Sequence, residues 1–190
     1  DDRAEVAAGA MLPDFAGMLG RRIGVVRDEG ITAGIAHHHR VDDAFHGAPT
    51  FTRLCGEGAR ELGRWGVRRG TSRAVAHVGV ELLLDGFLLE SGYDKGHYRA
   101  GLQALHPARG GHLIAFTPAV DRRLEDLRGR LLAEGAPWAY RDPAAVCGRL
   151  EMALAGRPLL AMRDQDHAPV RAYLSSTKAT LDNGTAAELM

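Results

Sequence analysis

The chain has 190 residues, of which 45 % are hydrophobic and 25 % are charged, so it is long enough for one domain with a substantial core. Its 24 basic and 24 acidic residues cancel, so no global electrostatic field draws it to nucleic acid or to a membrane surface. The longest clear apolar run, Leu82-Leu83-Leu84, ends at Asp85, far short of the about 20 residues that span a bilayer.

Helical periodicity dominates the chain after its first segment. The stretch from Gly9 to Gly24 holds Pro13 and four glycines, and we expect a loop with a short helix there. Thr117-Pro118 and Asp142-Pro143 each place a capping side chain before a proline, which is typical of a helix start. The predicted helices span residues 27–46, 48–65, 71–91, 94–105, 118–135, 143–155 and 159–176.

Evidence for strands is thin. Residues 112–116 form the only β-like run, and one isolated strand cannot make a sheet. The best internal hinge is at residues 109–111, but nothing indicates a second core beyond it. The sequence therefore predicts an all-α protein with a single domain over residues 1–190, whose tail from Lys178 is either helical or frayed.

The cysteines and the first residues bear on the cellular compartment. Cys55 and Cys147 lie far apart and outside any CxxC motif. This favours two reduced cytosolic thiols, with a disulfide as the open alternative. The chain begins at Asp1 and shows no signal peptide, so we expect a cytoplasmic protein in a processed form, with residues upstream of those given.

Two stripes of histidines and acids carry the candidate chemistry. His38, Asp42 and His46 follow one another at four-residue spacing, and so do His77, Glu81 and Asp85. Four residues turn an α-helix by about 400°, so each set lies on one slowly drifting stripe. These side chains bind Zn²⁺, Mn²⁺, Fe²⁺ or Mg²⁺. Two such stripes on facing helices would match the way in which helical bundles build metal sites.

Helix geometry limits this hypothesis. Residues four apart are separated by about 6 Å along the axis and can share an ion, whereas residues eight apart are separated by about 12 Å and normally cannot. Either two ions lie in a row, or the outer member of each stripe supports a ligand or contacts the substrate.

The second stripe lies in a very apolar helix, which predicts that Glu81 and Asp85 are buried. Buried carboxylates cost several kcal/mol each unless they are paired or bind a metal. A metal site is therefore favoured, and a structural network of polar side chains is the alternative.

Other candidates have weaker support. Asp14, after Leu12-Pro13, is a turn residue or a functional acid. Arg40 neighbours the stripe and can hold a phosphate group, although a surface salt bridge is the better default explanation. The remaining histidines show no paired spacing, and residues 164–166 are expected to form a solvated turn. The sequence has no P-loop, no GxGxxG after a strand and no GxSxG elbow, which argues against nucleotide-binding and α/β-hydrolase folds.

Three segments in chain order, at Gly9–Phe15, Gly34–Asp42 and Glu81–Leu88, resemble those of the acyl carrier protein phosphodiesterase family, an HD-like helical group. Gly9-Ala10-Met11-Leu12-Pro13-Asp14-Phe15 resembles its G-x-L-x-x-D-F segment. Gly34-Ile35-Ala36-His37-His38-His39-Arg40-Val41-Asp42 resembles its G-I-x-x-H-x-R-I-D segment. Glu81-Leu82-Leu83-Leu84-Asp85-Gly86-Phe87-Leu88 resembles its D-x-x-x-D-H-F-L segment. The likeness runs from Gly9 to Leu89 and is looser afterwards.

The resemblance implies an HD-domain-like helical bundle that hydrolyses a phosphodiester with a divalent metal, often Mn²⁺ or Mg²⁺. In the activity that names the family, phosphopantetheine is released from a serine of the carrier protein. Asp14, His38, Asp42 and Asp85 fall on the family's polar site positions, and Arg40 falls on its arginine.

The chain departs from the family pattern in four places. Gly86 stands where the family has a histidine, Glu81 replaces the first acid of that segment, and His46 replaces an acid near the end of the earlier helix. The family's N-terminal segment with its histidine has no counterpart before Gly9. These departures bear on the substrate more than on the fold.

We therefore predict a metal-dependent hydrolase of the phosphodiesterase type, acting on acyl carrier protein or on a small phosphodiester. Its ion would be Mn²⁺ or Mg²⁺, with Fe²⁺ as a further possibility. One alternative is an iron-dependent oxygenase of HD-like fold, and another is a non-catalytic binding module. The predicted metal ligands are His38, Asp42, His46, His77, Glu81 and Asp85, and the predicted catalytic residues are Asp14, Arg40 and Asp42.

Overall fold

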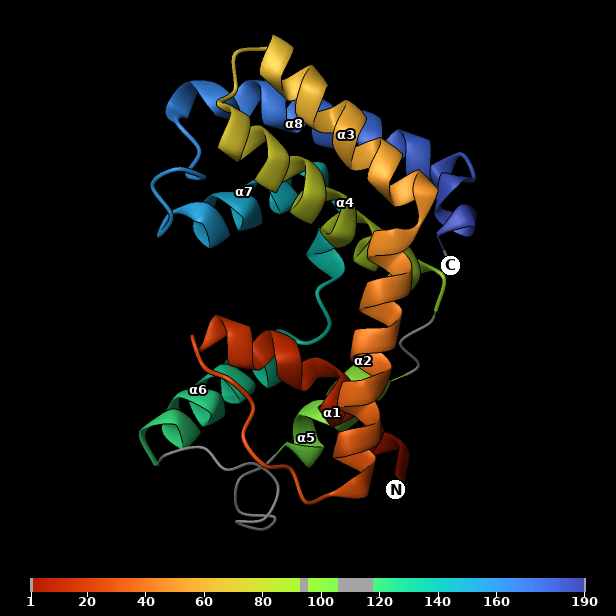
Figure 1. The fold of residues 1–190 in the computed structure, drawn as a ribbon, viewed down its shortest axis with the longest axis vertical. Helices are drawn as coiled ribbons and strands as arrows, with labels where there is room; N and C mark the ends of the chain where they lie inside the picture. Colours follow the sequence, from red (N-terminus) through yellow and green to blue (C-terminus); the bar gives the residue numbers. More distant parts are fainter. Residues whose placement is uncertain (1, 93–95, 106–117, 190) are drawn as a thin grey trace. The chain divides into compact units, whose positions relative to one another are not determined.

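A computed structural model describes residues 2–92, 96–105 and 118–189 of the chain. Within these ranges the regular structure is helical and contains no strand, which confirms the predicted all-α fold (Figure 1). The α-helices are α1 (Asp2–Met18), α2 (Glu29–Gly47), α3 (Pro49–Arg64), α4 (Arg69–Glu90), α5 (His97–Ala104), α6 (Pro118–Glu134), α7 (Pro143–Leu154) and α8 (His167–Asp182). Short 3-10 helices lie at η2 (Trp138–Arg141), η3 (Asp164–Asp166) and η4 (Thr185–Glu188).

The chain divides into two compact units. Unit 1 comprises Asp1–Ala44 and Asp94–Ala136, and unit 2 comprises Phe45–Tyr93 and Pro137–Met190. Helix α2 begins in unit 1 and ends in unit 2. Each unit has its own hydrophobic core, and the two are described separately below. The single domain that the sequence suggests stays a prediction.

Unit 1 is built around a close crossing of α1 and α2. A Cβ atom at Gly9 would fall on the carbonyl oxygen of Ile31, and one at Gly34 would fall on that of Val6. Both glycines therefore allow the two backbones to touch. Because a side chain at either position would clash with the neighbouring backbone, both glycines have a packing role. They are also the first residues of two of the segments that carry the family resemblance. The core beside the crossing comprises Ala8, Leu12, Phe15, Leu19, Ile31, Leu102, Ala104, Leu105 and Leu124.

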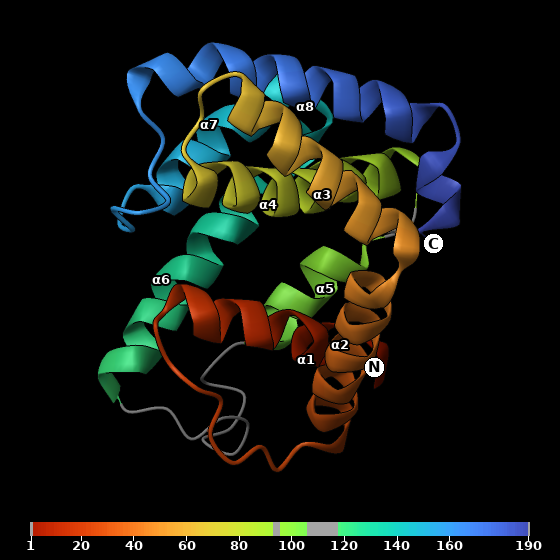
Figure 2. The same ribbon diagram turned by 45° about the horizontal axis from the view of Figure 1, so that its top comes forward.

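Unit 2 is a bundle of α3, α4, α7 and α8, which lie side by side in both views (Figures 1 and 2). A short link joins α3 to α4, so the two helices form an antiparallel pair. Gly58 of α3 lies against the ring of Tyr173, whose hydroxyl donates to the Ala76 carbonyl over 3.5 Å. Burial raises the pKa of that hydroxyl to about 12. The largest fully buried side chains here are Leu62, Val75, Val80, Val146, Leu150, Val170, Leu174 and Leu181.

Helix α1 (Asp2–Met18) corrects the prediction of a loop with only a short helix from Gly9 to Gly24. It continues to Met18 with Pro13 inside it. Its buried residues recur at spacings of three and four from Ala8 to Leu19, so burial of this stripe outweighs the hydrogen bond that the proline removes. Pro13 predicted a break in the helix, although the apolar residues around it already had helical spacing in the sequence.

The other helix bounds follow the predictions closely, with one exception. Helix α8 begins at His167 and not near residue 159. Proline lacks an N–H group and is tolerated in the first helical turn, so Pro169 is compatible with a start at His167 but not with one eight residues earlier. The β-like run at 112–116 and the hinge at 109–111 lie outside the described residues.

The turn before α8 also differs from the prediction. Asp166 is buried, with 1 % of its surface exposed, and accepts hydrogen bonds from the side chain and the backbone N–H of Arg163. All of residues 164–166 were expected to face solvent, but only Asp164 and Gln165 do. Across the described helices, none combines the length and the apolar character that crossing a membrane requires.

Candidate metal centre

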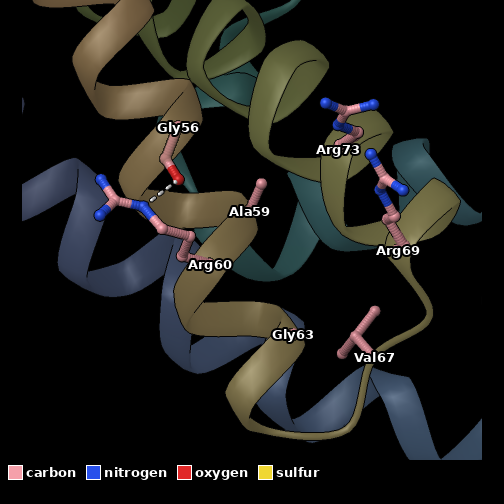
Figure 3. A pocket seen from close by; sticks show the side chains of 7 residues that line it. All are labelled: Gly56, Ala59, Arg60, Gly63, Val67, Arg69 and Arg73. Carbon is pink, nitrogen blue, oxygen red and sulfur yellow. Dashed lines mark hydrogen bonds between the residues drawn. The ribbon is translucent and has the colours of Figure 1, made fainter.

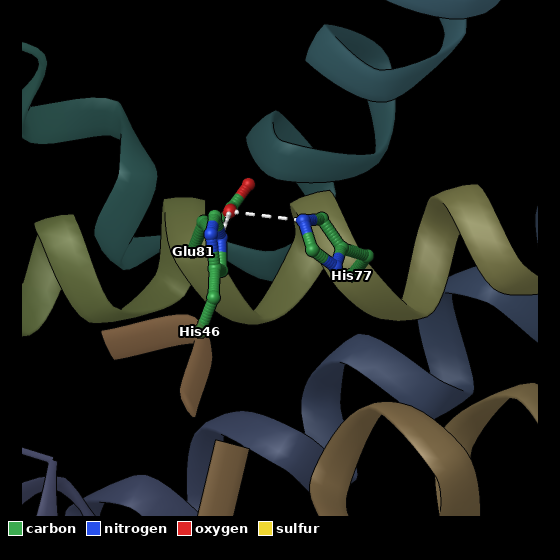
Figure 4. A group of neighbouring side chains, drawn as sticks. All are labelled: His46, His77 and Glu81. Carbon is green, nitrogen blue, oxygen red and sulfur yellow. Dashed lines mark hydrogen bonds and ion pairs between the residues drawn. The ribbon is translucent and has the colours of Figure 1, made fainter. Parts of the chain in front are cut away.

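Three predicted ligands meet within unit 2. His46 lies in the last turn of α2, and His77 and Glu81 lie one turn apart on α4. The end of α2 is fixed because Phe45 and Ala48, on either side of His46, pack against the core of unit 2. This packing holds the His46 imidazole over the stripe of α4 that carries His77 and Glu81 (Figure 4).

The contacts converge on one carboxylate oxygen. Glu81 Oε1 lies 2.8 Å from His46 Nε2 and 3.2 Å from His77 Nε2. The two imidazole rings are tilted against each other, with their centroids 4.9 Å apart. One ligand atom from each of the three residues lies within 4.8 Å of the others. The side chains are 33 %, 46 % and 31 % exposed for His46, His77 and Glu81, so the group faces solvent on one side.

This donor set fits a divalent metal ion. Ligand atoms at about 2.0–2.2 Å from one ion stand roughly 3.0–3.5 Å from each other in octahedral or tetrahedral geometry. The observed separations of 2.8 Å and 3.2 Å lie close to that range. Without an ion, the same distances describe an imidazole N–H donating to a carboxylate, so the geometry accommodates both a metal site and a polar network.

Phe51 of α3 packs against the buried side of the two imidazole rings. Its ring is 3 % exposed and packs edge-on against His77 and tilted against His46, with centroids 5.2 Å away in both cases. Phe45 continues the same aromatic stack, with its centroid 4.4 Å from that of Phe51. The two imidazoles therefore rest on an apolar floor and point their Nε2 atoms toward Glu81.

Cys55 lies near this group without joining it. Burial and, to a smaller extent, the charge of Glu81 raise the pKa of its thiol to about 11. The thiol is therefore protonated at neutral pH, and it donates weakly to the Ala76 carbonyl over 3.8 Å. Cys147 is also a free thiol, as favoured by the sequence.

The prediction that Glu81 and Asp85 are buried is wrong. Glu81 is about one third exposed, and Asp85 is exposed. Helix α4 is apolar over most of its surface, but the stripe of residues spaced four apart that contains both acids faces solvent. Asp85 lies one turn beyond Glu81, and the group of three ligands does not include it.

The predicted stripe on α2 divides between the two units. His38 and Asp42 belong to unit 1, where His38 Nδ1 lies 2.9 Å from the Ala10 carbonyl oxygen and Asp42 is exposed. Arg40 is exposed on the same helix, and Asp14 is exposed on α1, on a helix and not in a turn. Among the described residues, His46, His77 and Glu81 form the one group of three histidine, cysteine or acidic side chains with converging ligand atoms.

Gly86 explains one departure from the resembled family. A Cβ at this position would lie 2.5 Å from the Tyr140 carbonyl oxygen, because α4 packs closely against η2. The histidine that the family carries here has no room in this packing. The histidine of the resembled family is therefore not carried over to this position.

The expectation of two facing stripes holds at one position, where His46 of α2 meets His77 and Glu81 of α4. Sequence reasoning missed one feature of the site. It overlooked Phe51, although a large aromatic residue five positions after His46 was visible in the sequence. Comparisons of the chain with models of known protein families, with characterised proteins and with solved structures gave no match.

Proposed function

We propose that the chain is a metal-dependent hydrolase of the phosphodiesterase type, with one divalent ion held in unit 2 by His46, His77 and Glu81. The observation that carries this proposal is the convergence of three ligand atoms, from two helices, on one partly open point. The HD-domain-like character of the bundle, which the family resemblance implies, is part of the proposal.

The donor set favours some metals over others. Two imidazoles and one carboxylate suit Zn²⁺, Mn²⁺ and Fe²⁺, whereas Mg²⁺ prefers oxygen ligands and retains much of its water shell. Mn²⁺ is therefore favoured over Mg²⁺ for the proposed hydrolase. Asp85 is one turn away from Glu81 and can support a ligand or contact the substrate.

The residues of unit 2 have distinct parts in this proposal. A bound ion polarises phosphoryl oxygens and makes water acidic enough to ionise near neutral pH. His46, His77 and Glu81 would hold the ion as three protein ligands, and the exposed sides of the two imidazoles would leave it accessible to water and substrate. Phe51 packs against both rings and restricts their orientation. A small phosphodiester and the phosphodiester of acyl carrier protein are the proposed substrates, the latter on the family resemblance.

Metal content and hydrolysis test the proposal together. The purified protein is analysed for bound metals, and its turnover of bis(4-nitrophenyl) phosphate is measured with and without Mn²⁺. We expect Mn²⁺-dependent hydrolysis that His77→Ala abolishes. His167→Ala is the matched control, because His167 is a partly exposed histidine of unit 2 that lies 3.5 Å from Glu151. A protein that binds no divalent ion and stays inert with each one would contradict the proposal.

A second candidate function rests on the same three ligands. Two histidines and one carboxylate with open positions are also the ligand set of non-haem Fe²⁺ oxygenases. Iron that is retained through purification, with an optical change on admitting O₂ to the anaerobic protein, would favour this function. Phosphodiester hydrolysis under anaerobic conditions would favour the hydrolase.

A further inference from the structure

Helix α4 carries a longer polar stripe than the metal ligands alone. Arg69, Arg73, His77 and Glu81 follow one another at four-residue spacing. Each step advances about 6 Å along the axis and drifts by about 40°, so neighbouring members lie on nearly the same face. Arg73 therefore stands one turn from His77, on the side away from Glu81.

The two arginines line a cavity between α3 and the beginning of α4. Its volume is about 560 Å³, and its lining residues are Gly56, Ala59, Arg60, Gly63, Val67, Arg69 and Arg73. The α3 side is formed mainly by small residues, which leaves the space open. Figure 3 shows Arg69 and Arg73 projecting next to each other from α4. Arg60 lies on the other side, where its Nε–H donates to the Gly56 carbonyl over 3.1 Å.

The two α4 arginines of this cavity have no ion-pair partner in the described part of the chain. Arg69 and Arg73 are exposed, and neither has a hydrogen bond or an ion pair with another described residue. By contrast, Arg53 on the same helix pair has Glu57 as a partner. Two guanidinium groups that project side by side repel each other, and an anion between them would turn that repulsion into attraction. Their planar donor forks match the oxygens of a phosphate group.

We infer that Arg69 and Arg73 bind a phosphate group of the substrate in this cavity, one helical turn from the His77 end of the metal centre. This inference rests on the proposed function and specifies its substrate class, a phosphodiester with a second phosphate group that the cavity between α3 and α4 holds. The sequence suggested phosphate binding by Arg40, and this inference assigns that role to Arg69 and Arg73 of unit 2 instead.

Phosphate binding and ester hydrolysis are measured separately on the same set of proteins. The affinity for inorganic phosphate is determined by titration calorimetry on the metal-free and on the Mn²⁺-loaded protein. The variants are Arg73→Gln, the double variant Arg69→Gln/Arg73→Gln and the control Arg64→Gln. Arg64 is an exposed arginine of α3 that does not line the cavity, so its replacement changes the local charge equally. The Mn²⁺ content of each variant is measured as well.

We expect Arg73→Gln to weaken phosphate binding about tenfold, because a hydrogen bond to a charged group is lost, and the double variant to weaken it further. The kcat and KM for bis(4-nitrophenyl) phosphate should change little, since its single phosphate is engaged by the metal centre and this ester has no second phosphate for the cavity. Arg64→Gln should resemble the wild type, and Mn²⁺ content should be the same throughout.

Two other results would separate this inference from the proposed function. Equal phosphate affinity in the wild type, the arginine variants and Arg64→Gln would overturn the arginine site and leave the metal centre standing. Phosphate binding that depends on Arg69 and Arg73, in a protein that takes up no divalent ion, would support the arginine site and overturn the metal-dependent hydrolase.

Discussion

The two units use the same residue spacing with different results. In unit 1, His38 and Asp42 lie one turn apart on α2, and the neighbouring helix α1 presents backbone to α2 at Gly9 and Gly34. In unit 2, the end of α2 meets a stripe of side chains on α4, and His46 gains both His77 and Glu81 as neighbours. Four-residue spacing on one helix therefore supplies candidate ligands, and a second helix that presents side chains makes them a site.

The largest expected effect concerns the backbone contact in unit 1. Gly9→Ala places a Cβ on the Ile31 carbonyl oxygen, so α1 and α2 must move apart. We expect a loss of about 3 kcal/mol in the free energy of unfolding, measured by urea denaturation. Metal binding by unit 2 should be unaffected if the two units differ as described.

Gly17→Ala is the control for this substitution. Gly17 lies on the same helix, and its Cβ would meet nothing within 4 Å. Alanine in an open helical position is stabilising by about 0.5–1 kcal/mol. If Gly9→Ala were as stable as Gly17→Ala, the close crossing of α1 and α2 would be refuted.

A smaller effect is expected at the turn before α8 in unit 2. Burial alone raises the pKa of Asp166, but the Arg163 side chain and backbone N–H more than offset this, and the pKa is lowered from its ordinary 3.8. The ionised carboxylate therefore stabilises the fold above the unfolded-state pKa, and this contribution is lost as pH falls through the lower folded-state value. Asp166→Asn should cost about 2 kcal/mol at pH 7, with the difference from wild type shrinking below about pH 4.

Asp164→Asn is the matched control, because Asp164 lies in the same short helix and is exposed. Urea denaturation at pH 7 and near pH 3 compares all three proteins. A difference between Asp166→Asn and wild type that stays constant over this range would contradict the buried ion pair.

Much of the fold was predictable from local patterns. The proline signals predicted helix starts at Pro118 and Pro143, and α6 and α7 begin at these residues. The capping is direct at α7, where the Asp142 carboxylate accepts from the Ala144 N–H over 2.9 Å. The predictions failed where a single residue outweighed a longer pattern of apolar residues, as in α1, which continues through Pro13.

The candidate site was predictable only in part. Spacing identified His46, His77 and Glu81 as ligand types, but which helix His46 faces depends on the packing of Phe45 and Ala48 in unit 2. Counting apolar residues in α4 suggested that Asp85 is buried, although a polar stripe at four-residue spacing leaves one side of the helix to solvent. Local sequence contains the residues of such a site, and tertiary packing selects among them.

The melting temperature with and without Mn²⁺ tests the central claim most directly. At a hundredfold excess over Kd, metal binding to the folded state adds about 2.7 kcal/mol, which is about 5–10 °C for a chain of this size. We predict that Mn²⁺ raises the melting temperature of the EDTA-treated wild type and of Asp42→Asn by this amount, and that it leaves Glu81→Gln unchanged. An equal response in Glu81→Gln and wild type, or no response in any of the three, would contradict a metal centre built from His46, His77 and Glu81.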